Sequence, residues 1–316
     1  MQMSAGHATQ RLADPDAARS GVTEFLAYRL ATETFLRGVD LLNQVVGGNI
    51  SHGMLLNALW CLELSRTVPP QTSLILSDEW NGPMGIHELS RALGVPYSTV
   101  YRQLRQLIQR GMAARKTDRT IAISSAFVAS EAGMRFRQGS VANSVRLLVG
   151  LHRIGFLNGS IAALEGTPSM STVQEDVLFR SGMETILYCL LLTAKFYDDL
   201  VTGLVFKLVA TANIKHLTSA PEVISATVTV PDEMRRPVSV YNAARSLHMP
   251  YETTRRISKQ LLARNVFRLK PNSGLIVPSE VHGQSENTEA QQASFEVLSA
   301  GIAQLAHAGL TLEPIR

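Results

Sequence analysis

Residues 86–116 read IHELSRALGVPYSTVYRQLRQLIQRGMAARK, and residues 240–270 read VYNAARSLHMPYETTRRISKQLLARNVFRLK. Aligned without a gap, the two stretches are identical at 10 of 31 positions. The identical pairs are Arg91/Arg245, Leu93/Leu247, Pro96/Pro250, Tyr97/Tyr251, Thr99/Thr253, Arg102/Arg256, Gln106/Gln260, Leu107/Leu261, Arg110/Arg264 and Lys116/Lys270. This similarity predicts that the chain carries two copies of one structural unit.

Each copy has the pattern of two helices joined by a tight turn. In the first copy, Ile86, Leu89 and Leu93 have helical spacing, and Gly94 is a residue type suited to the left-handed conformation at a helix end. Pro96 then favours the start of a new helix, because its fixed φ suits the first turn. The predicted buried stripe of this second helix is Val100, Leu104, Leu107 and Ile108. The pattern indicates a helix-turn-helix.

Two short strands are predicted after each helix-turn-helix. They span 112–116 and 120–124 in the first copy, and 266–270 and 275–277 in the second. A helix-turn-helix followed by a β-hairpin is a winged helix. We therefore predict a first winged helix at residues 84–124 and a second winged helix at residues 232–278.

Positive charge is concentrated in the two predicted winged helices. The first contains seven Lys or Arg and two acidic residues, a balance of +5, and the second contains nine and three, a balance of +6. Because the whole chain carries +4, the remainder carries −7. This segregation is typical of a surface that binds nucleic-acid phosphates, so double-stranded DNA is the predicted partner.

The outward positions of the second helix in each copy are the candidate DNA contacts. In the first copy they are Tyr97, Ser98, Thr99, Tyr101, Arg102 and Arg105, and in the second copy they are Tyr251, Glu252, Thr253, Arg255, Arg256 and Lys259. An arginine in the major groove can bind a guanine edge with two hydrogen bonds, which makes Arg102 and Arg256 the predicted base contacts. Since most of the other positions differ, the two copies are expected to read different sequences.

Further candidate contacts follow the second helix. Lys116 and Lys270 are predicted phosphate contacts, which position a protein without reading the base. Arg119, at the first wing tip, is predicted to reach either the minor groove or a phosphate. Tyr97 and Tyr251 have two alternatives, a hydrogen bond to phosphate or packing of the turn onto the first helix.

The second copy departs from the first in its buried stripe. Thr254 and Ser258 replace Val100 and Leu104. We expect a small rotation of the helix to bring Ile257 into the core.

The similarity between the halves extends to a long helix ahead of each winged helix. Residues 22–36 (VTEFLAYRLATETFL) align with residues 173–187 (VQEDVLFRSGMETIL). The expected order in each half is helix, helix, winged helix and closing helix, with closing helices at 141–157 and 293–308. The predicted domains are a disordered segment 1–20, a first repeat 21–157, a linker 158–172 and a second repeat 173–316.

The first half resembles the MarR family of regulators. The resemblance rests on GVPYSTVYRQLRQLIQRG at 94–111, the wing tip Asp118–Arg119 followed by TIAIS, and SEAGMRF at 130–136, and it covers most of 24–157. It implies a mainly α fold with small β wings, in which long flanking helices form a dimer interface. One chain would then supply both halves of a pseudo-dimer, or two chains would form a homodimer. The chain departs from the family pattern in about five extra residues between Ser124 and Ser130, a longer loop before the winged helix and a second wing tip without an arginine.

Other residues give little indication of chemistry. Cys61 and Cys189 lie in apolar helical patterns and are interpreted as core thiols, and the eight histidines do not cluster at ligand spacing, so neither a metal nor a cofactor is predicted. No spacing of catalytic groups indicates an enzyme. The apolar stretch 186–214 is interrupted by Lys195, Asp198, Asp199 and Lys207, which favours buried helices over a membrane span. These helices could also shelter a small-molecule effector.

The sequence therefore predicts a cytoplasmic, bacterial-type transcriptional regulator that binds specific DNA sites through two winged helices in one chain. This location follows because the N-terminus lacks the pattern of a secretory signal. One alternative is a plasmid-type replication initiator, which also uses paired winged helices but binds repeated sites. Another is a scaffold that uses winged helices to bind proteins.

Overall fold

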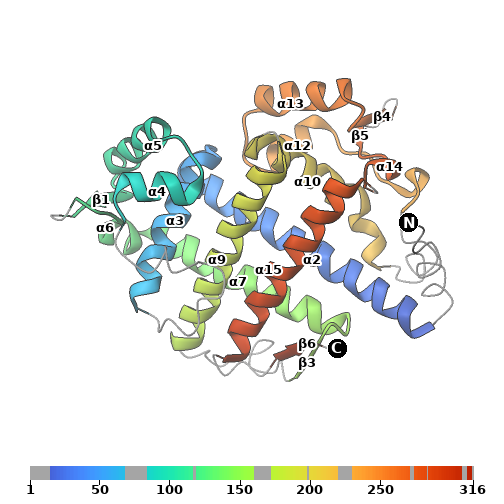
Figure 1. Ribbon diagram of the computed structural model, residues 1–316, viewed down its shortest axis with the longest axis horizontal. Helices are drawn as coiled ribbons and strands as arrows, with labels where there is room; N and C mark the ends of the chain where they lie inside the picture. The colour runs from blue at the N-terminus through green and yellow to red at the C-terminus, as the bar shows by residue number, and fades with distance from the viewer. Residues whose placement is uncertain are drawn as a thin grey trace, which may run out of the picture.

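The computed structural model describes residues 15–67, 84–116, 119–159, 172–197, 199–219, 230–270, 274–282, 284–307 and 312–314. The first half contains α2 (Pro15–Val46), α3 (Ile50–Thr67), α4 (Ile86–Leu93), α5 (Tyr97–Gln109), β1 (Ala113–Arg115), β2 (Ile121–Ile123), α6 (Ser125–Val128), α7 (Glu131–Arg153) and β3 (Leu157–Gly159). The second half contains α9 (Thr172–Phe196), α10 (Leu200–Ile214), η3 (Lys215–Ser219), η4 (Asp232–Met234), α12 (Val240–Ser246), α13 (Tyr251–Ala263), β4 (Arg268–Lys270), β5 (Gly274–Ile276), α14 (Ser279–His282), α15 (Ser285–His307) and β6 (Leu312–Pro314). The fold is mainly helical with small antiparallel sheets, as predicted (Figure 1).

The long helices of the two halves form one central layer. α2 packs along α7, and α9 packs along α15. The two halves also pack against each other, because α3 of the first half contacts α9 of the second, and α10 of the second half contacts α2 of the first. A single hydrophobic cluster runs through both halves, from Val39 in α2 to Leu187 in α9 and Ile302 in α15. The two halves therefore share a core.

Buried ion pairs occupy matching positions in α2 and α9, the long helices that begin the two halves and are called entry helices below. Arg29 donates to Glu33 at 2.6 Å in α2, and Arg180 donates to Glu184 at 2.7 Å in α9. All four side chains are at least nine-tenths buried. Loss of one partner would leave a buried charge uncompensated, at a cost of about 3–5 kcal/mol. The Arg and Glu residues that are identical in the two halves therefore stabilise the buried core.

Two segments have the length and composition of a membrane span. They are Thr172–Phe196 and Leu200–Leu217, and in each the apolar window is 67% buried inside the protein. α9 packs against α3, α7, α10 and α15, and α10 packs against α2 and α9. Such burial is typical of core helices, and the sequence pattern of residues 186–214 predicted buried helices.

The closing helices begin earlier than predicted. α7 begins at Glu131, ten residues before the expected start, and α15 begins at Ser285, eight residues before it. Ser130 caps α7 by accepting a hydrogen bond from the Gly133 amide at 3.1 Å. The prediction was wrong because the first turns of α7 are largely exposed and polar, so apolar periodicity does not mark them.

Other boundaries also differ from the sequence expectation. α2 begins at Pro15, inside the segment expected to be disordered, while residues 1–14 lie outside the described part of the chain. The expected linker begins with β3, which pairs antiparallel with β6 near the other end of the chain, and residues 160–171 lie outside the described ranges. This pairing joins the two halves at positions more than 150 residues apart, which local sequence patterns do not predict.

Candidate nucleic-acid interface

The first helix-turn-helix forms where the sequence pattern placed it. Gly94 adopts the left-handed conformation, with φ of 62°, and its amide donates to the Arg91 carbonyl at 3.1 Å. The Val95 amide donates to Ser90, also at 3.1 Å, which closes the end of α4. Pro96 then precedes α5. The turn is therefore fixed by backbone hydrogen bonds, and it sets the direction of α5.

α5 presents one apolar face to the core and one polar face to solvent. Val100, Leu104 and Leu107 are fully buried against the core, and Ile108 is half-buried, as predicted. The predicted outward residues lie on the opposite face: Tyr97, Ser98, Tyr101, Arg102 and Arg105 are exposed, and Thr99 is half-buried. α5 can therefore offer six adjacent side chains to a partner.

α13 uses the same four buried positions as α5. Thr254, Ile257, Ser258 and Leu261 are buried in α13, and their counterparts Val100, Gln103, Leu104 and Leu107 are buried in α5. The rotation expected for the second copy is therefore wrong. Ile257 needs no rotation because its position is already buried in the first copy, where Gln103 fills it. Tyr251, Glu252, Arg256 and Lys259 are exposed, and Thr253 and Arg255 are half-buried.

Both predicted wings form a two-stranded antiparallel hairpin. β1 pairs antiparallel with β2, and β4 pairs antiparallel with β5. In the first wing, Lys116 and Arg119 are exposed, and Arg119 adopts a left-handed backbone with φ of 66°. Asp118, part of the resemblance at the wing tip, lies outside the described residues.

Six basic side chains of the first winged helix are exposed to solvent. Within the described ranges, no ion pair involves any of the following exposed cations: Arg91, Arg102, Arg105, Arg115, Lys116 and Arg119. Exposed, unpaired cations on one domain attract a polyanion strongly.

Several cations of the second winged helix are held internally. Arg255 pairs with Glu252 at 2.7 Å on α13, and their hydrogen bond raises the pKa of Arg255. Arg268 in β4 contacts Asp232 and Glu280, each at 2.6 Å. Its neighbour Lys270 donates to the Asp232 carbonyl at 2.7 Å. Lys270 thus has one partner within its own domain, and the phosphate contact predicted for it stays a prediction.

Three aromatic rings stack along the exposed side of the first helix-turn-helix. His87 stacks on Tyr97 with 4.3 Å between ring centroids, and Tyr97 stacks on Tyr101 at 6.1 Å. Tyr97 remains 42% exposed. Both alternatives for Tyr97 are therefore compatible, since it packs α5 onto α4 and still leaves area for a partner. The helical spacing of Tyr97 and Tyr101 was visible in the sequence, but the contact with His87 depends on the turn.

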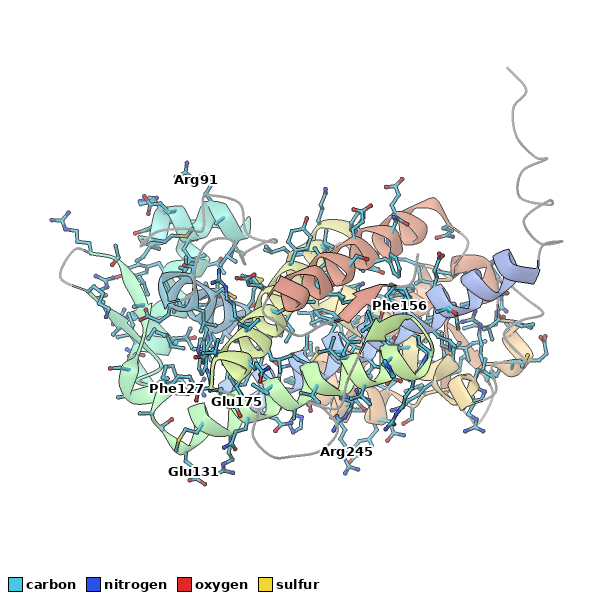
Figure 2. The ribbon with its side chains drawn as sticks, turned by 90° about the horizontal axis from the view of Figure 1, so that it is seen from below. Arg91, Phe127, Glu131, Phe156, Glu175 and Arg245 are labelled. Atoms are coloured by element: carbon cyan, nitrogen blue, oxygen red, sulfur yellow. The ribbon has the colours of Figure 1, made fainter. Side chains whose placement is uncertain are left out.

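The two helix-turn-helices lie on the same edge of the molecule, α5 on one side of α9 and α13 on the other (Figure 1). Arg91 and Arg245, which occupy matching positions, lie on opposite edges in the perpendicular view of Figure 2.

Contacts with α2 and the loop behind it fix both winged helices. Arg110, at the end of α5, donates to the Val46 carbonyl at 2.8 Å. On the other side, Asn43 donates to the Leu247 carbonyl at 2.6 Å, and the His248 ring lies 2.5 Å from Asp40. One long helix therefore touches the end of α5 in the first winged helix and the turn of the second, so a shift of α2 would move one winged helix relative to the other.

Comparison with known proteins gives one match. Residues 80–129 match the family described as sugar-specific transcriptional regulator TrmB. This segment contains α4, α5, β1, β2 and α6, which are the elements of the first winged helix. No curated protein and no solved structure matches the chain. The match supports a winged helix of a transcriptional-regulator family, a class that is not enzymatic, whereas the resemblance to the MarR family finds no support in it.

Proposed function

We propose that this protein is a sequence-specific DNA-binding transcriptional regulator, in which two winged helices of one chain bind adjacent sites on one duplex. The observation that carries the proposal is the exposure of Arg102 on α5 and Arg256 on α13, two helices on the same edge of the molecule. The match of residues 80–129 to a transcriptional-regulator family supports the same function. We place this activity in the cytoplasm, where the DNA is.

The proposal includes a tandem origin for the two halves. It is supported by the identities between residues 86–116 and 240–270 and by the order of elements, which is the same from α2 to α7 as from α9 to α15. The packing of α3 against α9 and of α10 against α2 also supports a tandem origin, because each helix contacts the entry helix of the other half. In this interpretation one chain forms a pseudo-dimer.

A direct test is a fluorescence-anisotropy titration of the full chain against its own upstream DNA and against scrambled DNA, at two salt concentrations. We expect preference for the native sequence to persist at the higher salt, because base contacts depend less on salt than phosphate contacts do. Footprinting should then show two half-sites centred about 10 bp apart, or a multiple of that spacing. A footprint confined to one short half-site would contradict the paired arrangement.

The same experiment separates the alternatives. Binding only to iterated sites at a replication origin would favour a replication initiator. Absence of DNA binding at both salt concentrations would favour a protein-binding scaffold.

A further inference from the structure

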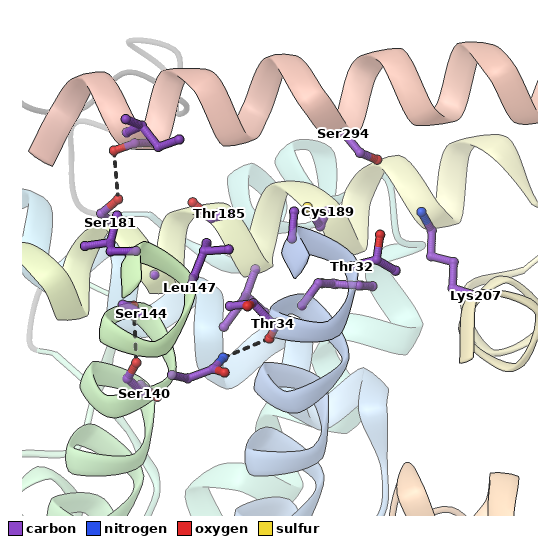
Figure 3. Close-up of a pocket in the computed structure, with 18 residues that line it drawn as sticks. Thr32, Thr34, Ser140, Ser144, Leu147, Ser181, Thr185, Cys189, Lys207 and Ser294 are labelled. Carbon is purple, nitrogen blue, oxygen red and sulfur yellow. Dashed lines mark hydrogen bonds between the residues drawn. The ribbon is translucent and has the colours of Figure 1, made fainter. Parts of the chain in front are cut away.

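The central helical layer contains a cavity where the two halves meet. It has a volume of about 60 Å³ and lies between α2, α7, α9 and α15 (Figure 3). Matching residues of the two halves line it as pairs. These pairs are Thr34/Thr185, Phe35/Ile186, Ser140/Ser294 and Leu148/Ile302. A ligand in this cavity would contact both halves at once.

One charged side chain breaks this pairing. Lys207 of α10 lines the cavity and is only 7% exposed. Its ammonium lies 6.0 Å from the centre of the Phe35 ring and 5.9 Å from that of Tyr197. No carboxylate among the residues that the structure describes forms an ion pair with Lys207. A buried cation without a counter-charge is costly, so an external anion would stabilise it.

Neighbouring groups that could carry a negative charge are neutral. Burial raises the pKa of the Cys189 thiol, which also lines the cavity, to about 11. Burial also raises the pKa of the Tyr197 phenol well above its usual range. Neither group therefore supplies a counter-charge to Lys207 at neutral pH.

Two polar atoms at the cavity have no partner within the described part of the chain. They are Ser140 Oγ and Asn143 Oδ1, on side chains that are 2% and 4% exposed. Arg29 Nε is also unpartnered, and it lines a second cavity that shares Thr32 and Lys207 with the first. Buried polar groups in native structures are nearly always satisfied, which indicates that a bound molecule completes this site.

The remaining hydroxyl groups do not favour a sugar. Thr32, Thr34 and Ser294 donate to backbone carbonyls of their own helices at 2.7–2.9 Å, so these donors are already used. The rest of the lining is largely hydrocarbon, from Leu147, Leu148, Ile186 and Ile302. Of the free groups, the Lys207 ammonium and the Ser140 hydroxyl can each donate to an acid group on an apolar body, whereas Asn143 Oδ1 is an acceptor and does not pair with a carboxylate. Because an apolar cavity of roughly 150 Å³ holds benzene, the smaller volume here suits an acid with fewer heavy atoms than benzene, such as acetate.

We propose that this cavity binds a small aliphatic carboxylate, with its acid group on Lys207 and its hydrocarbon body between α2 and α9. One molecule binds per chain, because Lys207 has no cationic counterpart among the described residues that line the cavity. The ligand contacts α2, and α2 touches the end of α5 in the first winged helix and the turn between α12 and α13 in the second. Ligand binding therefore changes the relative placement of the winged helices. This regulatory step rests on the proposed DNA-binding function, whereas the binding site itself does not.

Isothermal titration of the full chain without DNA tests the site, with acetate, its neutral amide acetamide, and glucose as probes. We expect acetate to bind with a stoichiometry of one and at least about tenfold more tightly than the amide, since a hydrogen bond to a charged group contributes that much. Lys207→Met should remove this preference, and Lys195→Met, at an exposed lysine of α9, should leave it unchanged. Equal affinities for acid and amide, or preferential binding of glucose, would overturn the proposal.

A second variant guards against a folding defect in Lys207→Met. Ala31→Leu narrows the cavity without touching the lysine and should weaken acetate binding, while both variants retain the melting temperature and helical circular dichroism of the wild type. Unchanged acetate affinity in Ala31→Leu would contradict the placement of the ligand. DNA affinity measured separately, with and without acetate, tests the regulatory step, so failure of DNA binding and failure of ligand binding are distinguishable.

Discussion

The two winged helices share one backbone plan but differ in what their basic residues contact. In the first, Arg105, Lys116 and Arg119 are exposed without ion-pair partners in the described part of the chain. In the second, Arg268 is held by Asp232 and Glu280, and Lys270 is held by the Asp232 carbonyl. The two winged helices therefore have similar net charges, +5 and +6, but differ in how many of their described cations are held by internal contacts. The number of free cations, and not the net charge, decides how strongly a surface attracts phosphates.

The largest expected effect is on the salt dependence of DNA binding. Replacing Arg105, Lys116 and Arg119 together by Ala should flatten the slope of log K against log salt by about 3, because each phosphate contact contributes roughly 0.9. Replacing Lys259, Arg268 and Lys270 together should flatten it by only about 1, because two of these cations are held internally. Anisotropy titrations over a range of salt concentrations measure both slopes. Equal slopes for the two variants would show that the internal contacts open on DNA.

α5 and α13 carry an arginine at the same position, Arg102 in α5 and Arg256 in α13, so the two helices can be compared directly. Arg102→Ala and Arg256→Ala should each weaken specific binding by about 1–3 kcal/mol and relax base preference, but at different half-sites, because the surrounding side chains differ. Binding to a library of site variants measures this. Gln109→Ala, at an exposed neutral position at the end of α5, is the control. Equal losses on specific and random DNA would mean that the arginine contacts only phosphate.

Acid should loosen the first winged helix through His52. This α3 side chain is 6% exposed, and burial together with nearby Arg110 and Arg102 lowers its pKa. The unfolded chain therefore binds the proton more readily, so the stabilisation present above about pH 6.5 is lost below it, by up to about 1.4 kcal/mol per pH unit. The protection factors of the α5 amides, which correct the exchange rates for the intrinsic slowing of amide exchange in acid, should fall from pH 7.5 to 5.5, and His52→Gln should reduce this change.

α13 is the internal control for that experiment. His52→Gln should leave the pH dependence of its exchange unaltered. An undiminished response of α5 in the variant would assign the pH effect to another group.

The smallest expected effect concerns the ion pair on α13. Glu252→Gln releases Arg255, which can then contact phosphate, so DNA affinity should rise by less than about fivefold and the salt slope should steepen by about 0.9. Gln260→Ala, at an exposed neutral position of α13 outside the predicted DNA contacts, should change neither quantity. Unaltered affinity and slope in Glu252→Gln would show that Arg255 faces away from the duplex.

Local sequence patterns predicted most of the two winged helices. Gly94 and Pro96 placed the turn, and Val100, Leu104 and Leu107 identified the buried face, because helix ends and amphipathic periodicity are local properties. The same reasoning failed at the start of α7, where exposed polar turns carry no apolar signal. It predicted the burial of Ile257 but missed that of the matching Gln103, which depends on neighbours outside the helix, and the expected helix rotation was therefore wrong.

The sequence by itself determined that two basic helix-turn-helix units occur in one chain and which of their side chains face solvent. These properties depend on residue spacing, chain-breaking residues and charge, all of which act over a few turns. Only the tertiary structure decided that Lys270 and Arg268 are held by internal contacts. It also decided that α3 and α10 each pack against the entry helix of the other half, and that Lys207 lines a cavity between the two halves. Those features require contacts between residues far apart in the chain, and the free energy of such contacts depends on packing that no local pattern records.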